Sequence, residues 1–249
     1  MNANARKIAA LCGKDLRDLA RNPTMLVSCL MPVAFMVLYR YLFSRNGEGV
    51  ADLDRIAPAL NGFMMSTAAL LSIAMVGSMV LLYGLAEEKE KHTLRTLMLA
   101  NVGAGQIMAA KLIITLAITA LAELLSFLVI GAPAAMLPAY LAIGVVGALP
   151  ILLVAALLGL ASRDQMTSGL YAVPLLLVAI APMFAMIDET FERIVVFLPT
   201  GGLDRLFKLL AEGTLFGAEA VLPVAVTAAW IVVCAVAFTL LFRRLSRDN

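Results

Sequence analysis

Six stretches of this sequence are long and apolar enough to cross a lipid bilayer as helices, and they limit the possible folds more than any other feature. A helix needs about 20 mostly apolar residues to span about 30 Å of hydrocarbon. Within each stretch the apolar residues are continuous rather than alternating, which excludes the strands of a membrane barrel. The expected spans are residues 24–43, 60–86, 112–132, 139–161, 169–187 and 221–242. The sequence therefore predicts an all-α integral membrane protein, with residues 1–249 forming one transmembrane domain.

The composition agrees with this prediction and excludes other classes of protein. Hydrophobic residues make up 62% of the chain and charged residues 14%, whereas about a quarter of a soluble domain is charged. Nineteen Lys and Arg against 17 Asp and Glu leave a net charge of +2, too balanced for a protein that binds nucleic acid. The single histidine, His92, and three widely spaced cysteines form no metal-binding pattern. We expect no metal site and no nucleic-acid partner.

The charge distribution predicts the orientation of the chain in the membrane. In residues 1–23, apolar residues recur at helical spacing, and cations such as Lys14 and Arg17 occupy the remaining faces. This segment is expected to be an amphipathic elbow helix on the membrane surface, ended by Pro23. The segments on its side of the membrane hold 13 Lys and Arg, and those on the other side hold 5. Such an excess marks the cytoplasmic side. We therefore expect a multi-pass protein of a prokaryotic cell (inner or plasma) membrane with both termini in the cytoplasm.

The sequence offers no group of residues suited to catalysis. Enzymes that work within the membrane need reactive side chains at membrane depth, and the one histidine and the aspartates all lie outside the spans. The run from Gly103 to Lys111 lacks the Gly-Lys-Ser/Thr ending of a phosphate-binding loop. We expect a transport subunit rather than an enzyme, with no catalytic residue and no cofactor of its own. Any ATP and Mg would be bound by another chain.

The cytoplasmic connection between the second and third spans, residues 87–111, carries the most distinctive pattern. It starts with the acidic pair Glu87-Glu88, and Leu94 and Leu97 then share one helical face while charges cover the rest. An amphipathic segment in this place suits docking onto another protein. A solvated connecting loop is the alternative interpretation.

This connection resembles the type-two permeases of ATP-binding-cassette (ABC) exporters, the group that includes exporters of drugs and antimicrobial peptides. Their signature is an acidic pair after the second span, Thr-Leu, further leucines, a turn, and a lysine that opens the third span. The elbow helix and the long connection between the fifth and sixth spans match as well, so the resemblance covers the whole chain. Val102 and His92 depart from the usual proline and glycine, which concerns the geometry of the turn. The matching positions are Glu87, Glu88, Thr93, Leu94, Leu97, Leu99, Gln106, Ile107 and Lys111.

The resemblance implies partners that the sequence alone does not reveal. In such exporters the elbow helix and this coupling loop contact a separate ATPase subunit, present in two copies, which binds ATP and Mg. Two permease chains, identical or different, pair among the membrane lipids so that their first, second and fifth spans surround the substrate path. The residues expected to couple to the ATPase are Lys14, Arg17, Glu87, Glu88, Thr93, Leu94, Arg95, Leu97 and Lys111.

Residues within the spans suggest where cargo could pass. Glu123 is the only acidic residue well inside a span, and a carboxylate there is functional by default, although a buried packing role is the alternative. Methionines adapt to varied apolar ligands but also serve simple packing. Pro174, with Pro182, would bend the fifth span. The expected substrate path comprises Glu123, Met64, Met75, Met79, Pro174 and Met183.

The connection of residues 188–220 is too apolar for a free loop. Two short helices that dip into the outer half of the membrane would explain this composition, because non-helical backbone at that depth must be buried in protein. The resemblance implies re-entrant helices that act as an external gate. The residues expected to form it are Phe197, Pro199 and Leu206.

Taken together, these features predict the membrane subunit of an ATP-driven exporter of a lipophilic drug-like compound or an antimicrobial peptide. Related permeases carry sodium, lipids or polysaccharides, and these cargoes stay open. An ATP-independent carrier or channel is the rival class, but it would show several intramembrane charges for ion coupling, and only Glu123 is present. A membrane scaffold is a third possibility.

Overall fold

The computed structural model describes residues 3–46 and 53–245, and these residues form helices joined by short connections, with no strand among them. Six of the helical segments are long and apolar enough to span a membrane, which confirms the prediction of an all-α membrane protein. These segments are Pro23–Ser44, Ala57–Glu90, Ala104–Ile130, Ala134–Ala161, Gln165–Ala185 and Ala218–Phe242. The α-helices are α1 (Ala3–Arg21), α2 (Pro23–Asn46), α3 (Leu53–Leu71), α4 (Ser78–Glu90), α5 (Thr93–Leu99), α6 (Ala104–Ile130), α7 (Leu137–Ala161), α8 (Gln165–Ile180), α9 (Glu189–Val195), α10 (Gly201–Glu212) and α11 (Val221–Leu245).

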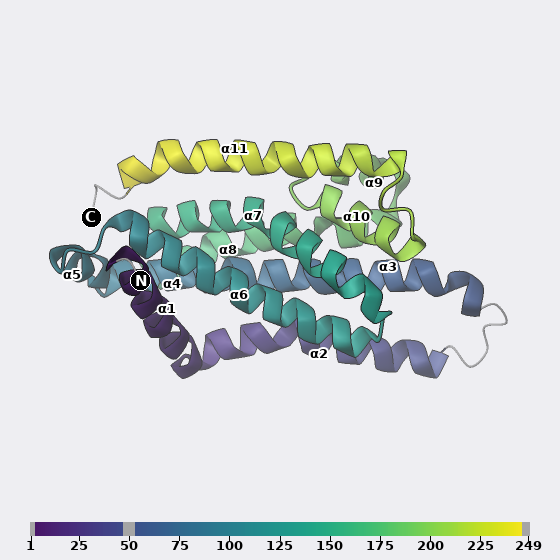
Figure 1. Cartoon of the computed structure of the whole chain (residues 1–249), viewed down its shortest axis with the longest axis horizontal. Helices are drawn as coiled ribbons and strands as arrows, with labels where there is room; N and C mark the ends of the chain where they lie inside the picture. The colour runs from purple at the N-terminus through teal and green to yellow at the C-terminus, as the bar shows by residue number, and fades with distance from the viewer. Residues whose placement is uncertain (1–2, 47–52, 246–249) are drawn as a thin grey trace.

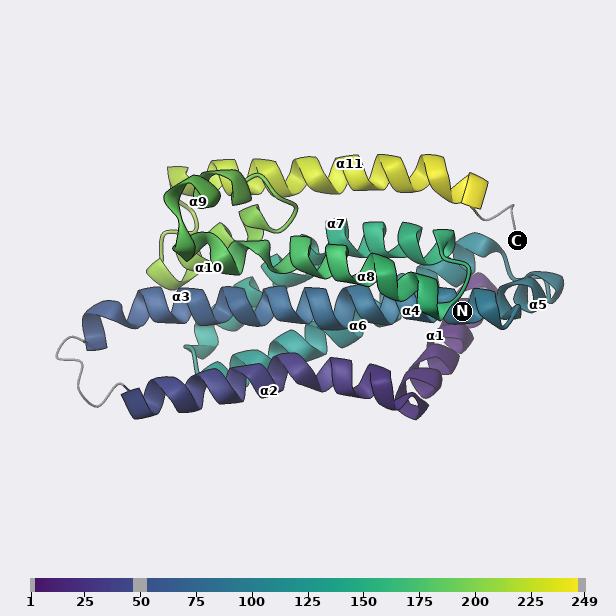
Figure 2. The ribbon, with the colours of Figure 1, turned by 180° about the vertical axis from the view of Figure 1, so that it is seen from behind.

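The long helices run side by side, and the short ones gather at the two ends of the bundle (Figures 1 and 2). Helices α1 and α5 and the last turn of α11 lie at one end, called here the α5 end. Helices α9 and α10 lie at the opposite end, called the α10 end. The segment expected to contain two short helices, residues 188–220, thus contains α9 and α10, both on the side of the bundle opposite α1.

The second span is the centre of the bundle. In its most apolar window 78% of residues are buried, compared with 11% in the first and in the last span. It consists of α3, a π-helical segment at Ser72–Gly77, and α4. Small residues let neighbouring helices approach closely: a Cβ atom on Gly77 would lie 2.9 Å from Leu152 of α7 and 3.1 Å from Thr119 of α6. At about 1.5 Å per residue its 34 residues extend about 50 Å, so α4 reaches beyond the hydrocarbon and carries α5.

The third span starts earlier than its apolar run suggests. Gly103 precedes the first turn of α6, and its N–H donates to Gln106 Oε1 at 3.0 Å, so the helix begins at Ala104 rather than near residue 112. Lys111 therefore lies two turns inside α6. At the other end, Gly131 adopts a left-handed φ of 74°, and Arg40 of α2 donates to the carbonyl of Val129. A cation at a helix C-terminus is favourable because it meets the negative end of the helix dipole.

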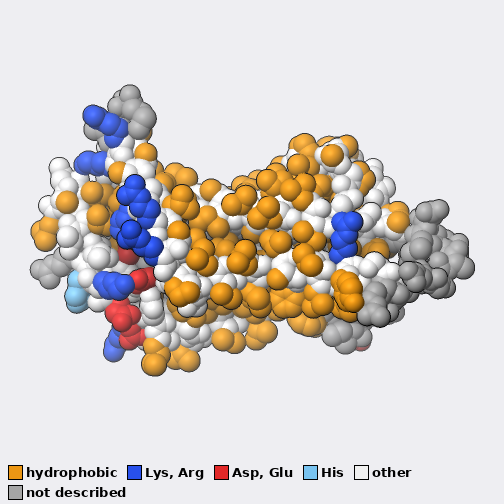
Figure 3. Space-filling model, turned by 90° about the horizontal axis from the view of Figure 1, so that it is seen from below, with side chains coloured by type: hydrophobic (Ala, Val, Ile, Leu, Met, Phe, Trp, Pro, Cys, Tyr) orange, Lys and Arg blue, Asp and Glu red, His pale blue; other side chains and the backbone are white. Residues whose placement is uncertain are grey.

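Charged side chains occupy the ends of the molecule and leave the middle apolar. Figure 3 shows a broad band of hydrophobic side chains along one face, with Lys, Arg, Asp and Glu gathered mostly near the α5 end. Such a band is what a lipid bilayer requires of a protein that crosses it. The chain is a multi-pass membrane protein.

Candidate functional site

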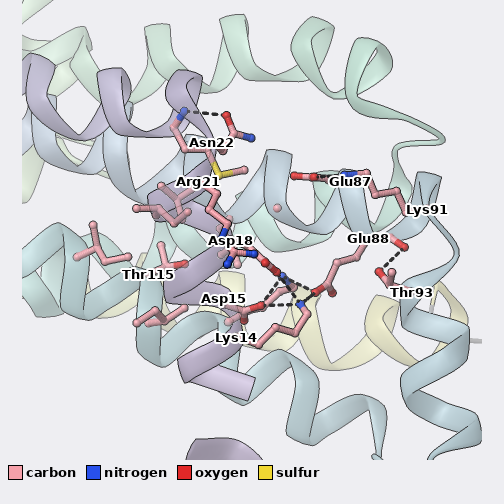
Figure 4. A pocket seen from close by; sticks show the side chains of 18 of the residues that line it. Lys14, Asp15, Asp18, Arg21, Asn22, Glu87, Glu88, Lys91, Thr93 and Thr115 are labelled. Carbon is pink, nitrogen blue, oxygen red and sulfur yellow. Dashed lines mark hydrogen bonds and ion pairs between the residues drawn. The ribbon is translucent and has the colours of Figure 1, made fainter. Parts of the chain in front are cut away.

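At the α5 end, five charged side chains from three helices form one network (Figure 4). Lys14 Nζ of α1 lies 2.5 Å from Glu88 Oε1 of α4, 3.0 Å from Asp15 Oδ1 and 3.3 Å from Asp18 Oδ2. Lys111 Nζ of α6 lies 3.2 Å from Glu88 Oε1 and 3.6 Å from Asp15 Oδ1. The structure thus brings together three residues singled out from the sequence, Lys14, Glu88 and Lys111. We call the five residues the charged network.

Two members of the charged network are almost completely buried. Glu88 and Lys111 are each 7% exposed, and buried charges are costly unless they are paired. Burial lowers the pKa of Lys14, but hydrogen bonds and charge interactions with Glu88 and Asp15 outweigh this effect and raise its pKa above the usual lysine value. Both lysines use Oε1 of Glu88, and Oε2 has no hydrogen-bond partner among the residues described. The network therefore retains one buried acceptor without a donor.

Asp15 and Asp18 were missed as site residues. A signal was present, because residues at i and i+4 share a helix face and Asp18 lies four residues after Lys14. This signal is common on helix surfaces, and nothing local shows that this face of α1 meets Glu88, 74 residues away in the sequence.

The two adjacent glutamates, which read as one acidic pair in the sequence, have different surroundings. Glu87 forms an ion pair with Lys91 at 2.5 Å, in which both side chains reach solvent. Glu88 points instead into the charged network, and its carbonyl accepts a hydrogen bond from Thr93 Oγ1 at 3.1 Å. Of the two glutamates, only Glu88 therefore joins α4 to the elbow helix.

The last turn of α4 contacts several helices at once. Lys89 Nζ donates to the carbonyl of Leu160 at the end of α7, at 2.7 Å. Glu90 Oε2 accepts from the N–H of Gln165 at the start of α8, at 3.0 Å. With Glu88 joined to α1 and α6, three consecutive residues connect the end of the second span to four other helices.

Helix α5 is held to the rest of the chain by apolar contacts. Leu94 and Leu97 are half-buried against a cluster formed by Leu11 of α1 and by Ile107 and Ala110 of α6. Lys7 Nζ donates to the carbonyl of Asn101 at 2.6 Å, and Gln106 Nε2 donates to Asn4 Oδ1 at 2.9 Å, which adds polar links between α1 and the loop. The two leucines thus face their own chain. The apolar side chains that α5 exposes are Leu99, which is 82% exposed, and Met98, which is 39% exposed.

Of the two arginines expected to couple to the ATPase, the structure describes the side chain of Arg17 only. Arg17 is exposed on α1, and no ion pair to it is found in the part of the chain that the structure describes. Arg95 lies on α5, but its side chain is outside the described residues.

A cavity of about 600 Å³ opens between α1, the start of α2, α4 and α6 (Figure 4). Its polar lining comprises the charged network, Glu87 and Lys91 toward the α5 end, and Arg21 at the end of α1. Its opposite wall is apolar and includes Leu19, Met25, Val80, Leu81, Ile114 and Ile118. We call this space the α1 cavity.

The residues expected to line a substrate path are dispersed, and none of them lines the α1 cavity. Glu123 is fully buried, and its carboxylate lies over Gly144 of α7, where a Cβ atom would be 2.2 Å from Oε2. Neither oxygen of Glu123 has a hydrogen-bond partner among the described residues, including the nearby Ser126 and Thr119. Met64 belongs to the main apolar core, Met75, Met79 and Met183 pack against it, and Pro174 is exposed on α8.

The residues expected at an external gate lie around α10. Pro199 and Leu206 are buried, while Phe197 is exposed and its carbonyl accepts from Trp230 Nε1 at 2.8 Å. Asp204, which sequence reasoning missed, lies 2.5 Å from Ser66 Oγ of α3 and 2.8 Å from Lys208 Nζ. The contact with Ser66 holds α10 against the second span, whereas the ion pair with Lys208 lies within α10.

The fold is that of a protein that crosses the membrane several times. Its longest span, the second, ends at the α5 end, where the helices α1 and α5 pack together. Comparison with known families matches residues 15–241 to the family described as fluoroquinolones export permease protein, Rv2686c-like. The chain belongs to this family, and the match includes all six spans. Among curated proteins no significant match is found. The chain is therefore an export permease of the ABC transporter class.

Proposed function

We propose that this chain is the membrane subunit of an ATP-driven exporter, and that a separate ATPase subunit docks at the α5 end. The proposal is supported by the contacts that hold the helices together at the α5 end. The charged network and the apolar cluster around Leu94 join α1 and the 87–111 loop to the last turn of the most buried span. A protein that pushes on α5 would thus push on the whole bundle.

Transmission follows from the contacts of α4. ATP can favour one state of the exporter only through contacts that differ between the states. A docked ATPase that moved on binding ATP would displace α5 and, through Glu88, Lys89 and Glu90, would displace α1, α6, α7 and α8. Short helices in direct contact transmit such a displacement as rigid-body motion.

The surface that would meet the ATPase differs from the one suggested by the leucine pattern. Leu94 and Leu97 stabilise α5 against its own chain, whereas Leu99 and the half-exposed Met98 present apolar surface outward. Exposed cations, Arg17 and Lys91 among them, would surround this patch. In this orientation the α5 end faces the cytoplasm, in line with the positive charge of its loops.

The cargo is proposed to be a lipophilic, drug-like compound, and the family name points to fluoroquinolones. Two permease chains would form the path together, because α8 presents a row of exposed apolar residues that a second copy could cover. These include Leu170, Val173 and Leu177. An antimicrobial peptide is the other cargo that the resemblance implies. The expected site of action is the prokaryotic cell membrane.

The test is drug transport by inverted membrane vesicles that contain the chain with or without its ATPase partner. We expect ATP-dependent accumulation of a fluoroquinolone only when both are present. The variant Leu99→Asp should reduce copurification of the ATPase at least tenfold, because a charge would enter the centre of an apolar contact. The control is Phe216→Asp, at an exposed apolar residue in the connection that follows α10, which should leave copurification unchanged. Transport by the chain alone, without ATP, would show an ATP-independent carrier instead.

A further inference from the structure

The α1 cavity is not explained by docking of an ATPase, since it opens between the elbow helix and the spans. We propose that this cavity binds a zwitterionic amphiphile, a molecule with an ammonium group and an anionic group on an apolar body. An aminophospholipid of the surrounding leaflet and a zwitterionic drug both have this chemistry. The proposal concerns this chain alone and goes beyond the proposed function. It would deepen that function if the ligand is the cargo.

The charges that line the α1 cavity cancel one another. The basic side chains are Lys14, Arg21, Lys91 and Lys111, and the acidic ones are Asp15, Asp18, Glu87 and Glu88. A ligand with a net charge of either sign would gain from one set and be repelled by the other. A zwitterion can place each of its charges next to the opposite one, so its two groups are both stabilised.

Two of these groups have unused capacity for a ligand. Glu88 Oε2 has no donor among the described residues but is fully buried, so the acidic group open to a ligand is Asp18, whose side chain is 59% exposed and pairs with Lys14 at 3.3 Å. A primary ammonium brings three donors and a positive charge. Arg21 ends α1 at the cavity and has no ion pair in the described part of the chain, and its guanidinium suits a phosphate or carboxylate. The structure thus offers one place for a cation and one for an anion.

The cavity changes from polar to apolar along two helices in the same direction. On α4, Val80 lies seven residues before Glu87, and on α6, Ile118 lies seven residues after Lys111. Seven residues of helix correspond to about 10 Å. Because α4 runs toward the α5 end and α6 runs away from it, both place charges at that end and apolar side chains deeper in the bundle. An amphiphile at the membrane surface has the same order of polar head and apolar body.

The size of the cavity fits this class of ligand. Its volume of about 600 Å³ falls within the usual range of about 300–1,000 Å³ for pockets that bind small molecules. Gly84 lies between the polar and the apolar wall, and its missing side chain leaves room beside Lys111 Nζ, which would be 3.7 Å from a Cβ atom there.

The experiment measures binding to the purified chain in detergent, without an ATPase, so that its failure is distinct from failure of the proposed function. The probes are dioctanoyl phosphatidylethanolamine, the corresponding phosphatidylglycerol, and a zwitterionic fluoroquinolone, each titrated by native mass spectrometry. We expect at least one zwitterion to bind at least tenfold more tightly than the anionic phosphatidylglycerol. Binding of the lipid alone would identify a lipid site, binding of the drug alone a cargo site, and mutual competition a shared one. Equal or tighter binding of phosphatidylglycerol, or no binding of either zwitterion, would overturn the proposal.

Two pairs of variants locate the binding. Ile114→Trp should fill the apolar part of the cavity and weaken binding at least tenfold, whereas Ile113→Trp, at the adjacent and 52% exposed position, should not. Arg21→Gln changes an exposed side chain and leaves packing intact, and it should also weaken binding. Arg6→Gln removes an exposed cation from the same helix outside the cavity and serves as its control. Unchanged binding in both cavity variants would place the ligand elsewhere and refute the assignment.

Discussion

The difference between Glu87 and Glu88 leads to a sharp prediction, because adjacent residues receive the same substitution and should behave differently. Glu88→Gln keeps the size of the side chain but removes the charge that lies between two ammonium groups, 2.5 and 3.2 Å away. Glu87→Gln removes a partly exposed partner of Lys91, whose own side chain is 64% exposed. Surface ion pairs contribute little to stability, so only the first variant should loosen the elbow helix.

The magnitude follows from the contacts of Glu88. Hydrogen bonds to charged groups contribute about 1.5–3 kcal/mol when they are buried. The amide of Gln still accepts one bond, and Asp15 remains close to both lysines, so we expect a loss of about 1–3 kcal/mol in docking of α1. This loss would raise the fraction of molecules with α1 undocked by about 5–150-fold.

Cys12 provides the assay. Its Sγ contacts the carbonyl of Ala110 on α6 at 3.6 Å, and burial, followed by the charge of Asp15, raises the pKa of the thiol. Alkylation should therefore be slow while α1 is docked. With Cys29 and Cys234 replaced by alanine, Glu88→Gln should accelerate maleimide labelling of Cys12 at least fivefold, and Glu87→Gln should match the unsubstituted chain. Equal labelling rates in the two variants would refute the assigned role of Glu88.

Three further predictions concern stability. Gly144→Ala would place a Cβ atom 2.2 Å from Glu123 Oε2, so thermal unfolding should show a loss of about 1–3 kcal/mol, while Gly105→Ala, with no atom within 4 Å, should show none. Asp164 caps α8, and a hydrogen bond from a backbone N–H lowers its pKa, so replacing it with Ala should lower the melting temperature at pH 7. Because the folded pKa is the lower one, that difference should be present above about pH 4 and vanish as pH falls through the lowered pKa. Lys14 has a raised pKa, so the unsubstituted chain should melt at a higher temperature than Lys14→Met. This difference should be constant below the ordinary lysine pKa of 10.5 and should decline as pH rises beyond it. A constant difference up to pH 12 would contradict the pairing with Glu88.

The spans could be predicted because transfer of apolar surface into lipid depends on local composition. Their boundaries could not, as α6 shows: its helix begins at Ala104, where the backbone finds a cap in Gln106, well before the apolar run starts. The leucine pattern of the 87–111 loop likewise predicted an amphipathic helix. It also favoured docking onto another protein, whereas both leucines pack against the chain's own α1 and α6, because one apolar face suits a partner subunit and the same chain equally well.

Glu123 shows the same limit within a span. The sequence marked it as an isolated intramembrane carboxylate and suggested Ser126 or Thr119 as partners. The structure places it against the bare backbone of Gly144, on a helix that no local pattern connects with it.

By itself, the sequence determined that the chain is a helical membrane protein with six spans and a charged loop after the second one. Tertiary structure alone decided that Glu88 and not Glu87 meets Lys14 and Lys111, and that a cavity lies between α1 and the spans. The physical reason is the separation along the chain of the residues that each property involves. Hydropathy and helical periodicity are properties of neighbouring residues, whereas an ion pair or a cavity depends on how helices far apart in the chain pack together.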